Sequence, residues 1–340
     1  MGLIAGSHVY VQSLPDGKLL ISPENEIKPI RKKTIDITNI NGSNLERTFI
    51  AVYLTGYDVI EFTSAKITAD QKKILRSICH RLIGLEILEE SSNLVLIQDM
   101  LNPKELPIKQ AIQRMSQISF SMFNDSILSF CSCDSDLATD IMERDNEVYR
   151  LYMVISRLSK SVLCGTKAID LSSTSIEEYH NYRMAASSIE RIANYSHKIA
   201  RSVILLQPVL DEKRTAEIKK MADFAADSFK QSVKSLLTLN PELANQVIEN
   251  KKEINQLITD FNRDYFDKSI DLSFDSMIGI RTVIDSIGRI TDYAANIGEI
   301  AINASIDVPV EAPAVVDAPT DTSESEVIGL IDEDLESENE

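Results

Sequence analysis

Apolar and polar positions follow two different periods along this chain, and the change of period divides it near Asn102. Before that point, short runs with the two-residue alternation of β-strands are bounded by turn residues such as Pro15-Asp16-Gly17. The predicted strands are residues 8–11, 18–22, 34–38, 58–63, 86–88 and 94–98. A helix over Leu45–Leu54 and a second that opens with Thr68-x-x-Gln71 are predicted between strands. This order predicts an N-terminal β-hairpin followed by a small α/β layer with both helices on one face of its sheet.

After Asn102 the apolar residues recur at spacings of three and four, which is the period of an amphipathic helix. Capping and proline signals mark the starts of new helices. They are Asp134 or Ser135, Ser175 with Glu178, and Asn240 with Pro241. The pattern predicts six helices of roughly 27 to 35 residues joined by short loops, and therefore antiparallel helical bundles.

The six predicted helices form two copies of a three-helix unit. Ile189–Ile199 matches Ile287–Ile297 at a constant offset of 98, and Glu143–Leu151 matches Glu249–Leu257 at an offset of 106. The predicted fold class is mainly α, with tandem three-helix bundles preceded by the small α/β segment. The predicted domains are 1–33 (partial hairpin module and basic connector), 34–101 (α/β segment), 102–208 (first bundle), 209–306 (second bundle) and 307–340 (disordered acidic tail).

Two motifs in the repeats point to a known family. Glu190–Tyr195 and Gly288–Ile297 resemble the E-R-I-G-D-H-A-x-N-I signature of the PhoU family of phosphate-uptake regulators. Met1–Val11 is similar to one half of the SpoVT/AbrB-type module that precedes the PhoU repeats in one branch of that family. Such a module needs two strand-bearing halves and only one precedes Pro23, so a partial module is expected. The resemblance implies a cytoplasmic, homodimeric, non-enzymatic regulator that binds the ATPase of a phosphate ABC transporter or a signalling protein.

The resemblance also locates a metal motif, which this chain has largely lost. The family places two acids four residues apart on a helix. The four matching positions hold Asp145 and Tyr149 in the first copy and Lys251 and Asn255 in the second. The family has another acid later in each repeat, and that position holds Asn194 in the first copy and Asp292 in the second. A cluster of Fe or Zn needs several carboxylates or imidazoles, so we expect that no metal cofactor is required. The alternative, a metal-binding PhoU-like protein, would use Glu143, Asp145 and Asp292.

Basic residues provide two further candidate sites. Arg191 and Arg289 recur in both copies, where they would form either an interhelical bridge or a docking site for a partner. The connector Lys28, Arg31, Lys32 and Lys33 is a candidate contact for DNA. It supports the alternative of an AbrB-type DNA-binding transcriptional regulator with a PhoU-like sensing domain. The other interpretation of this run is a solvated connector.

Composition and charge narrow the possibilities. The net charge is −17, but Asp307–Glu340 contains 12 acidic and no basic residues, so the rest of the chain is nearly balanced. No apolar run approaches the ~20 residues that span a bilayer, and no secretory signal is visible, which predicts no membrane insertion and a cytoplasmic location. The phosphate-binding and nucleophile motifs G-x-x-x-x-G-K-[ST] and G-x-S-x-G are missing, in line with a non-enzymatic protein.

Overall fold

The computed structural model describes residues 9–13, 19–23, 30–101, 106–164, 174–208, 210–267 and 273–306. The chain divides into the units Met1–Ile306 and Asp307–Glu340. The second unit lies outside the described residues, and so do the predictions made for the acidic tail and for Lys28.

The N-terminal strands form the predicted hairpin ladder. β1 (Val9–Ser13) pairs antiparallel with β2 (Leu19–Pro23), with Val9 opposite Pro23. A separate four-stranded sheet has the order β3-β4-β6-β5, in which β3 and β4 are parallel and the other neighbours antiparallel. Its strands are β3 (Lys32–Asp36), β4 (Val59–Thr63), β5 (Leu85–Glu90) and β6 (Leu94–Asp99).

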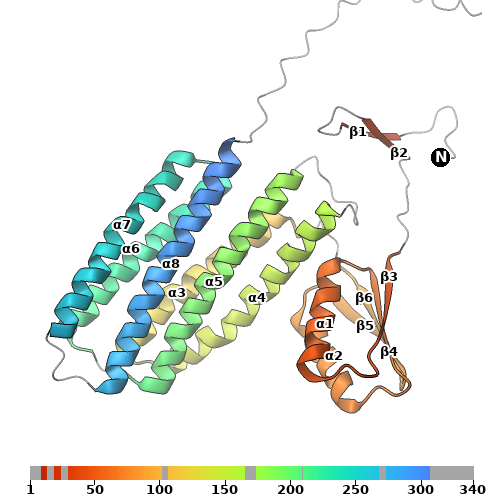
Figure 1. Ribbon diagram of the computed structural model, residues 1–340, viewed down its shortest axis with the longest axis horizontal. Helices are drawn as coiled ribbons and strands as arrows, with labels where there is room; N and C mark the ends of the chain where they lie inside the picture. Colours follow the sequence, from red (N-terminus) through yellow and green to blue (C-terminus); the bar gives the residue numbers. More distant parts are fainter. Residues whose placement is uncertain are drawn as a thin grey trace, which may run out of the picture. The chain divides into compact units, whose positions relative to one another are not determined.

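Two helices cover one face of this sheet, as predicted. They are α1 (Gly42–Thr55) and α2 (Ala69–Arg81). Side chains alternate along β4 and β6, so that Ile60, Phe62, Val95 and Ile97 are buried in one core with helix residues such as Phe49. Figure 1 shows both helices on the same side of the strands.

The start of α2 is fixed by the capping box seen in the sequence. Thr68 Oγ1 accepts a hydrogen bond from the Gln71 backbone N–H at 3.2 Å, and Gln71 Oε1 accepts one from the Thr68 N–H at 2.9 Å. The Gln71 amide also donates to the Ile37 carbonyl at 2.8 Å, which ties the helix start to the end of β3.

We expect Thr68→Ala to lower the free energy of unfolding by about 1 kcal/mol, because a free backbone N–H of the first turn loses its acceptor. Urea denaturation followed by circular dichroism measures the change. Thr48→Ala, on the exposed side of α1, is the control and is expected to change stability by less than about 0.5 kcal/mol. Equal effects of the two substitutions would contradict a capping role.

The rest of the described chain forms six long helices, which confirms the predicted fold class. They are α3 (Ile108–Ser132), α4 (Ser135–Leu163), α5 (Ile176–Leu206), α6 (Glu212–Thr238), α7 (Pro241–Asp267) and α8 (Phe274–Ile306). Asp134 and Ser175 cap α4 and α5 at the predicted positions, and Asn240 accepts from the Leu243 N–H at 2.8 Å at the start of α7. None of the helices in the described ranges combines the length and apolar character that crossing a bilayer requires.

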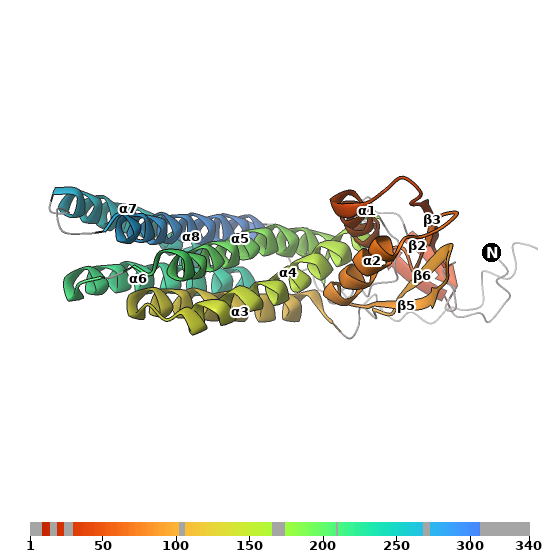
Figure 2. The same ribbon diagram turned by 90° about the horizontal axis from the view of Figure 1, so that it is seen from below.

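The six helices pack as two layers. The helices α4, α5, α8 and α7 lie side by side in that order, with α3 and α6 behind them (Figures 1 and 2). α5 and α8 are the neighbours at the junction of the two copies, and they run antiparallel. One continuous hydrophobic core joins both copies and includes Phe123 of α3 and Phe229 of α6, which lie 106 residues apart. This spacing equals one of the repeat offsets seen in the sequence.

Candidate functional site

The repeated motif positions come together on the front layer of helices. We call Asp145 and Tyr149 of α4 with Asn194 of α5 the first motif face. We call Lys251 and Asn255 of α7 with Asp292 of α8 the second motif face. Each face therefore lies at the seam between the second and third helices of its own copy.

The first motif face forms one wall of a cleft of about 280 Å³. The cleft is lined by Glu46, Arg81, Asp145, Asn146, Tyr149, Glu190 and Asn194. The Arg81 guanidinium comes from α2, pairs with Glu46, and lies 5.5 Å from the centre of the Tyr149 ring. Burial raises the pKa of Tyr149 above an ordinary value of 10.0 that already keeps its hydroxyl protonated at neutral pH. The α/β layer thus contributes Glu46 and Arg81 to the walls of this cleft.

The second motif face carries an ion-paired cluster. Lys251 Nζ lies 2.8 Å from Asp292 Oδ1, and Arg289 Nη1 lies 3.5 Å from Asp292 Oδ2. Both carboxylate oxygens of Asp292 therefore face a cation of the chain itself. Asn255, the remaining member of this face, is exposed.

These donors do not fit the metal cluster that the family resemblance implies. Glu143 is exposed, Asp145 lies 3.5 Å from His197 Nδ1, and Asp292 is occupied by Lys251. Within the described ranges, no group of three or more His, Cys, Asp or Glu side chains is arranged to hold a metal ion. We therefore assign no metal chemistry to Glu143, Asp145 and Asp292.

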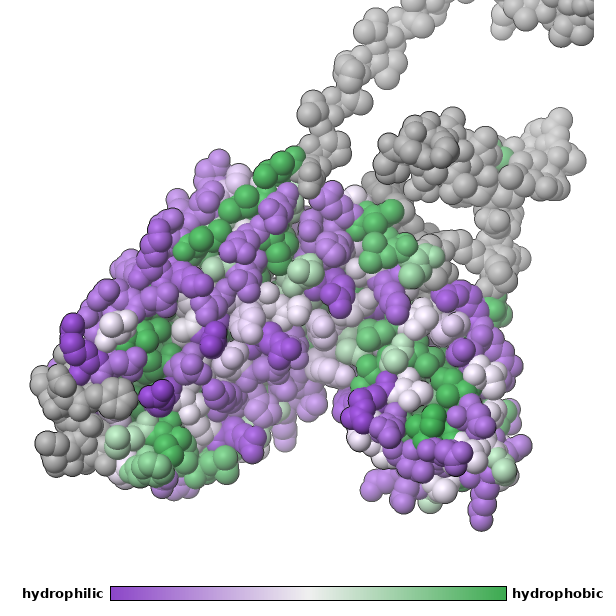
Figure 3. Space-filling view, in the orientation of Figure 1, coloured by the Kyte–Doolittle hydropathy of each residue, from purple (hydrophilic) through white to green (hydrophobic). Residues whose placement is uncertain are grey.

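The two repeated arginines are exposed. The Arg191 side chain is 59% exposed and the Arg289 side chain 57% exposed, and their ion pairs are with Glu190 and Asp292 of their own helices. The equivalent tyrosines Tyr195 and Tyr293 meet between them, with ring centroids 6.0 Å apart. Figure 3 shows that the surface of this layer is mostly hydrophilic, with hydrophobic patches towards the helix ends. The arginines are thus placed for contact with another molecule.

The described part of the basic connector is engaged within the protein. The Arg31 guanidinium lies 4.8 Å from the centre of the Tyr57 ring, and Lys32 Nζ lies 2.5 Å from Glu61 Oε1. Lys33 is exposed. The contact of this connector with DNA stays a prediction.

A buried ion pair, which the sequence analysis missed, joins the α/β layer to the first bundle. Arg157 of α4 pairs with Asp99 of β6, and the two side chains are 1% and 0% exposed. Arg157 also donates to the Tyr57 carbonyl at 3.2 Å, and its guanidinium lies 4.5 Å from the centre of the Tyr53 ring. Burial raises the pKa of Tyr53 to about 12. The signal in the sequence was an arginine at a core-facing position of an apolar helix segment, flanked by Val154 and Leu158.

The second copy lacks this docking surface. The buried Met153 and Arg157 of α4 correspond, 106 residues on, to Thr259 and Arg263 of α7, which are exposed. The matching arginine pairs instead with Asp260 on its own helix at 2.6 Å. The equivalent helices α4 and α7 therefore have different roles. The α/β layer packs against α4, whereas the matching positions of α7 are exposed to solvent.

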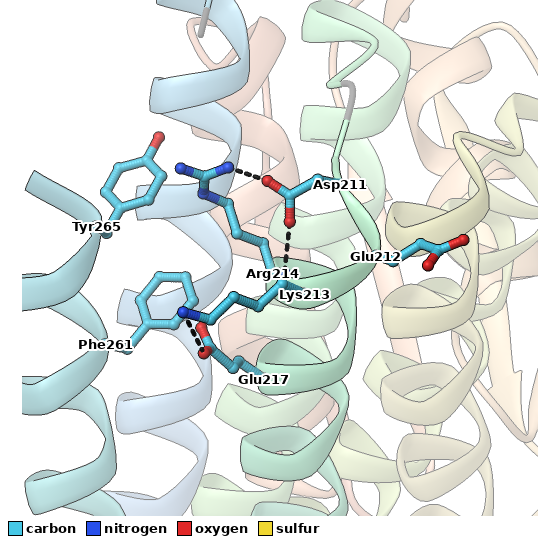
Figure 4. Close-up of a pocket in the computed structure, with 7 residues that line it drawn as sticks. All are labelled: Asp211, Glu212, Lys213, Arg214, Glu217, Phe261 and Tyr265. Atoms are coloured by element: carbon cyan, nitrogen blue, oxygen red, sulfur yellow. Dashed lines mark hydrogen bonds and ion pairs between the residues drawn. The ribbon is translucent and has the colours of Figure 1, made fainter. Parts of the chain in front are cut away.

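A second cleft, of about 500 Å³, lies between the start of α6 and the end of α7 (Figure 4). Its walls are formed by Asp211, Glu212, Lys213, Arg214, Glu217, Phe261 and Tyr265. Arg214 pairs with Asp211 and lies 5.4 Å from the centre of the Tyr265 ring. Asp211 accepts hydrogen bonds from Arg214, and the one from the Arg214 backbone N–H does most to lower the pKa of Asp211. This carboxylate therefore stays charged and neutralises the arginine. Lys213 Nζ lies 3.8 Å from Glu217 Oε1, so both basic groups among these lining residues face a carboxylate.

The six helices and the two motif faces define a protein built from two copies of a three-helix unit, packed on one shared core. The PhoU domain model matches residues 112–203 and 218–301, which is more than half of the chain. The chain therefore belongs to the PhoU domain family. The match does not extend to the residues before Ile112, so the AbrB-type module stays a prediction.

Solved structures show the same bundle fold. PhoU from Pseudomonas aeruginosa is similar with a TM-score of 0.50 and 17% identity, covering 57% of this chain and 93% of that protein. The phosphate transport system regulatory protein PhoU from Streptococcus pneumoniae has a TM-score of 0.52 and 16% identity, covering 60% and 96%. No curated protein sequence matches this chain significantly.

Proposed function

We propose that this protein regulates phosphate uptake and phosphate signalling through protein–protein contacts, without catalysing a reaction. The observation that carries the proposal is the pair of exposed arginines, Arg191 and Arg289, at matching positions of two PhoU repeats. The proposed partner is the ATPase of a phosphate ABC transporter or a signalling protein, and the proposed assembly is a homodimer. The name of the S. pneumoniae relative, a regulatory protein of phosphate transport, supports the class of function.

The proposed docking surface comprises Arg191 and Tyr195 on α5 with Arg289 and Tyr293 on α8. Because the two helices run antiparallel, the arginines lie on opposite sides of the tyrosine pair. Each arginine precedes its tyrosine by four residues, so they are roughly 12 Å apart along the helix axes at about 1.5 Å per residue. Arginine and tyrosine are the residue types that often dominate the free energy of protein interfaces. A partner with acidic side chains at two such points would match this surface.

We expect the double variant Arg191→Ala/Arg289→Ala to weaken binding of the transporter ATPase roughly 30-fold or more, the size of a hot-spot effect. Pull-down from cells grown in high phosphate identifies the partner, and calorimetric titration with that purified partner measures the change in Kd.

The matched control is Lys230→Ala/Lys234→Ala, which removes the same charge from exposed positions of α6 in the rear layer. It is expected to leave the affinity within about threefold of the original, since surface substitutions outside an interface have small effects. Equal weakening by both double variants would mean that net charge, and not this surface, determines binding. Recovery of no transporter or signalling component would remove the support for the proposed function.

A further inference from the structure

We propose that Lys251 provides the resident cation of the second motif face, so that this PhoU protein holds that face together without a metal ion. The Lys251 ammonium group extends from α7 to Asp292 on α8, with Nζ 2.8 Å from Oδ1. It therefore joins the same two helices that a shared metal ion would join. This role of Lys251 belongs to the second repeat and is independent of which regulatory partner the protein binds.

Both oxygens of the Asp292 carboxylate face a basic group of the protein. Its Oδ1 faces Lys251 and its Oδ2 faces Arg289 Nη1 at 3.5 Å. Carboxylates bind cations through these same oxygens, so a metal ion would have to displace Lys251 from Oδ1 or Arg289 from Oδ2. The cluster of two cations and one carboxylate has a net charge of +1, and a divalent cation would be repelled by it.

The neighbouring acids of α7 are directed elsewhere. Glu249 Oε2 binds Lys252 at 2.7 Å, and Glu253 is exposed. Asn255 lies four residues after Lys251, and its side chain could offer a metal ion only an uncharged amide oxygen as a ligand. A neutral amide and one neutralised carboxylate are too few ligands for Fe or Zn, which need three or four.

The first motif face also contains a basic side chain of the protein. Arg81 lies in the cleft beside Tyr149, at a guanidinium to ring-centre distance of 5.5 Å. Here the group comes from the α/β layer and not from the repeat itself. The second motif face is the better place to test the proposal, because its ion pair is formed by two helices of one repeat.

Restoring the acids should convert the second face into a metal site. We expect Lys251→Asp/Asn255→Asp, which places two carboxylates four residues apart opposite Asp292, to retain about one equivalent of Zn²⁺ or Fe per chain after dialysis. Its melting temperature should rise by a few degrees on addition of metal and fall on addition of a chelator. The original protein should retain far less than one equivalent, and a chelator should leave its melting temperature unchanged. Elemental analysis and thermal denaturation provide the two readouts.

The matched control is Lys109→Asp/Gln113→Asp, which makes the same changes at a lysine and an amide four residues apart, both exposed, on α3. We expect it to gain no metal, because the ion pair of Lys251 with Asp292 is left intact. Circular dichroism establishes that both variants are helical before metal is added. Stoichiometric metal in the original protein would overturn the proposal. Failure of the folded Lys251→Asp/Asn255→Asp variant to gain metal, or equal gain by the control, would also overturn it.

Discussion

Arg157→Met is expected to lower the free energy of unfolding by about 3 to 5 kcal/mol, because it removes one member of the buried ion pair that Arg157 forms with Asp99. Methionine keeps most of the length and apolar packing of the arginine stem, so the loss reports mainly on the ion pair. Urea denaturation measures it. Hydrogen exchange of α4 backbone amides is expected to rise around Met153, where that helix contributes to the core of the α/β layer.

Arg263→Met is the matched control for this substitution. Arg263 occupies the equivalent position of the second repeat, but its side chain is 67% exposed and pairs with Asp260 on the same helix. Its loss should cost less than about 0.5 kcal/mol. The double variant Arg157→Met/Asp99→Leu is expected to recover part of the lost stability, since it removes both buried charges. If the Arg157 and Arg263 substitutions had equal effects, the buried pair would not be what docks the α/β layer on α4.

Phe229→Ala is expected to destabilise the protein by a similar amount, about 3 to 5 kcal/mol, because it removes a ring that is 1% exposed from the core shared by the two repeats. The cavity left in a close-packed interior adds to the lost burial of the ring. When the variant is unfolded in urea, the helical signal of the bundle should still be lost in a single transition, because one continuous core joins both copies.

Phe274→Ala is the control for the ring substitution. Phe274 begins α8 and is 75% exposed, so its truncation should change the unfolding free energy by less than about 0.5 kcal/mol. Two separate transitions for Phe229→Ala would indicate that the repeats unfold independently. That result would contradict the single core.

Several features of the fold were predictable because they depend on residues that are close in sequence. Thr68 with Gln71 and Ser175 with Glu178 form capping boxes in the structure, as their spacing predicted. The offset that related α4 to α7 also relates Phe123 to Phe229 in the shared core. The alternating strands gave the correct elements of the α/β layer, although their order across the sheet, β3-β4-β6-β5, required the structure.

The candidate site was predictable only in part. The resemblance picked out Asp145, Tyr149 and Asn194, and the structure brings these three into one cleft. It did not indicate that Arg81 and Glu46 of the α/β layer complete that cleft. Arg191 and Arg289 were recognised by their repetition, but their exposure and their position beside the tyrosine pair came from the packing of α5 against α8.

The sequence by itself determined the helical repeats, their caps, the hairpin strands and the loss of the family's acids, because each depends on residue type and on spacings of two to four residues or on a constant repeat offset. The tertiary structure decided which charges meet. Arg157 finds Asp99 over a separation of 58 residues, and Lys251 reaches Asp292 across the seam between α7 and α8. No local period encodes such pairs, since they form only when separate helices and strands pack against one another. That packing also excludes water from the pair of Arg157 with Asp99, whereas the pair of Lys251 with Asp292 stays partly exposed.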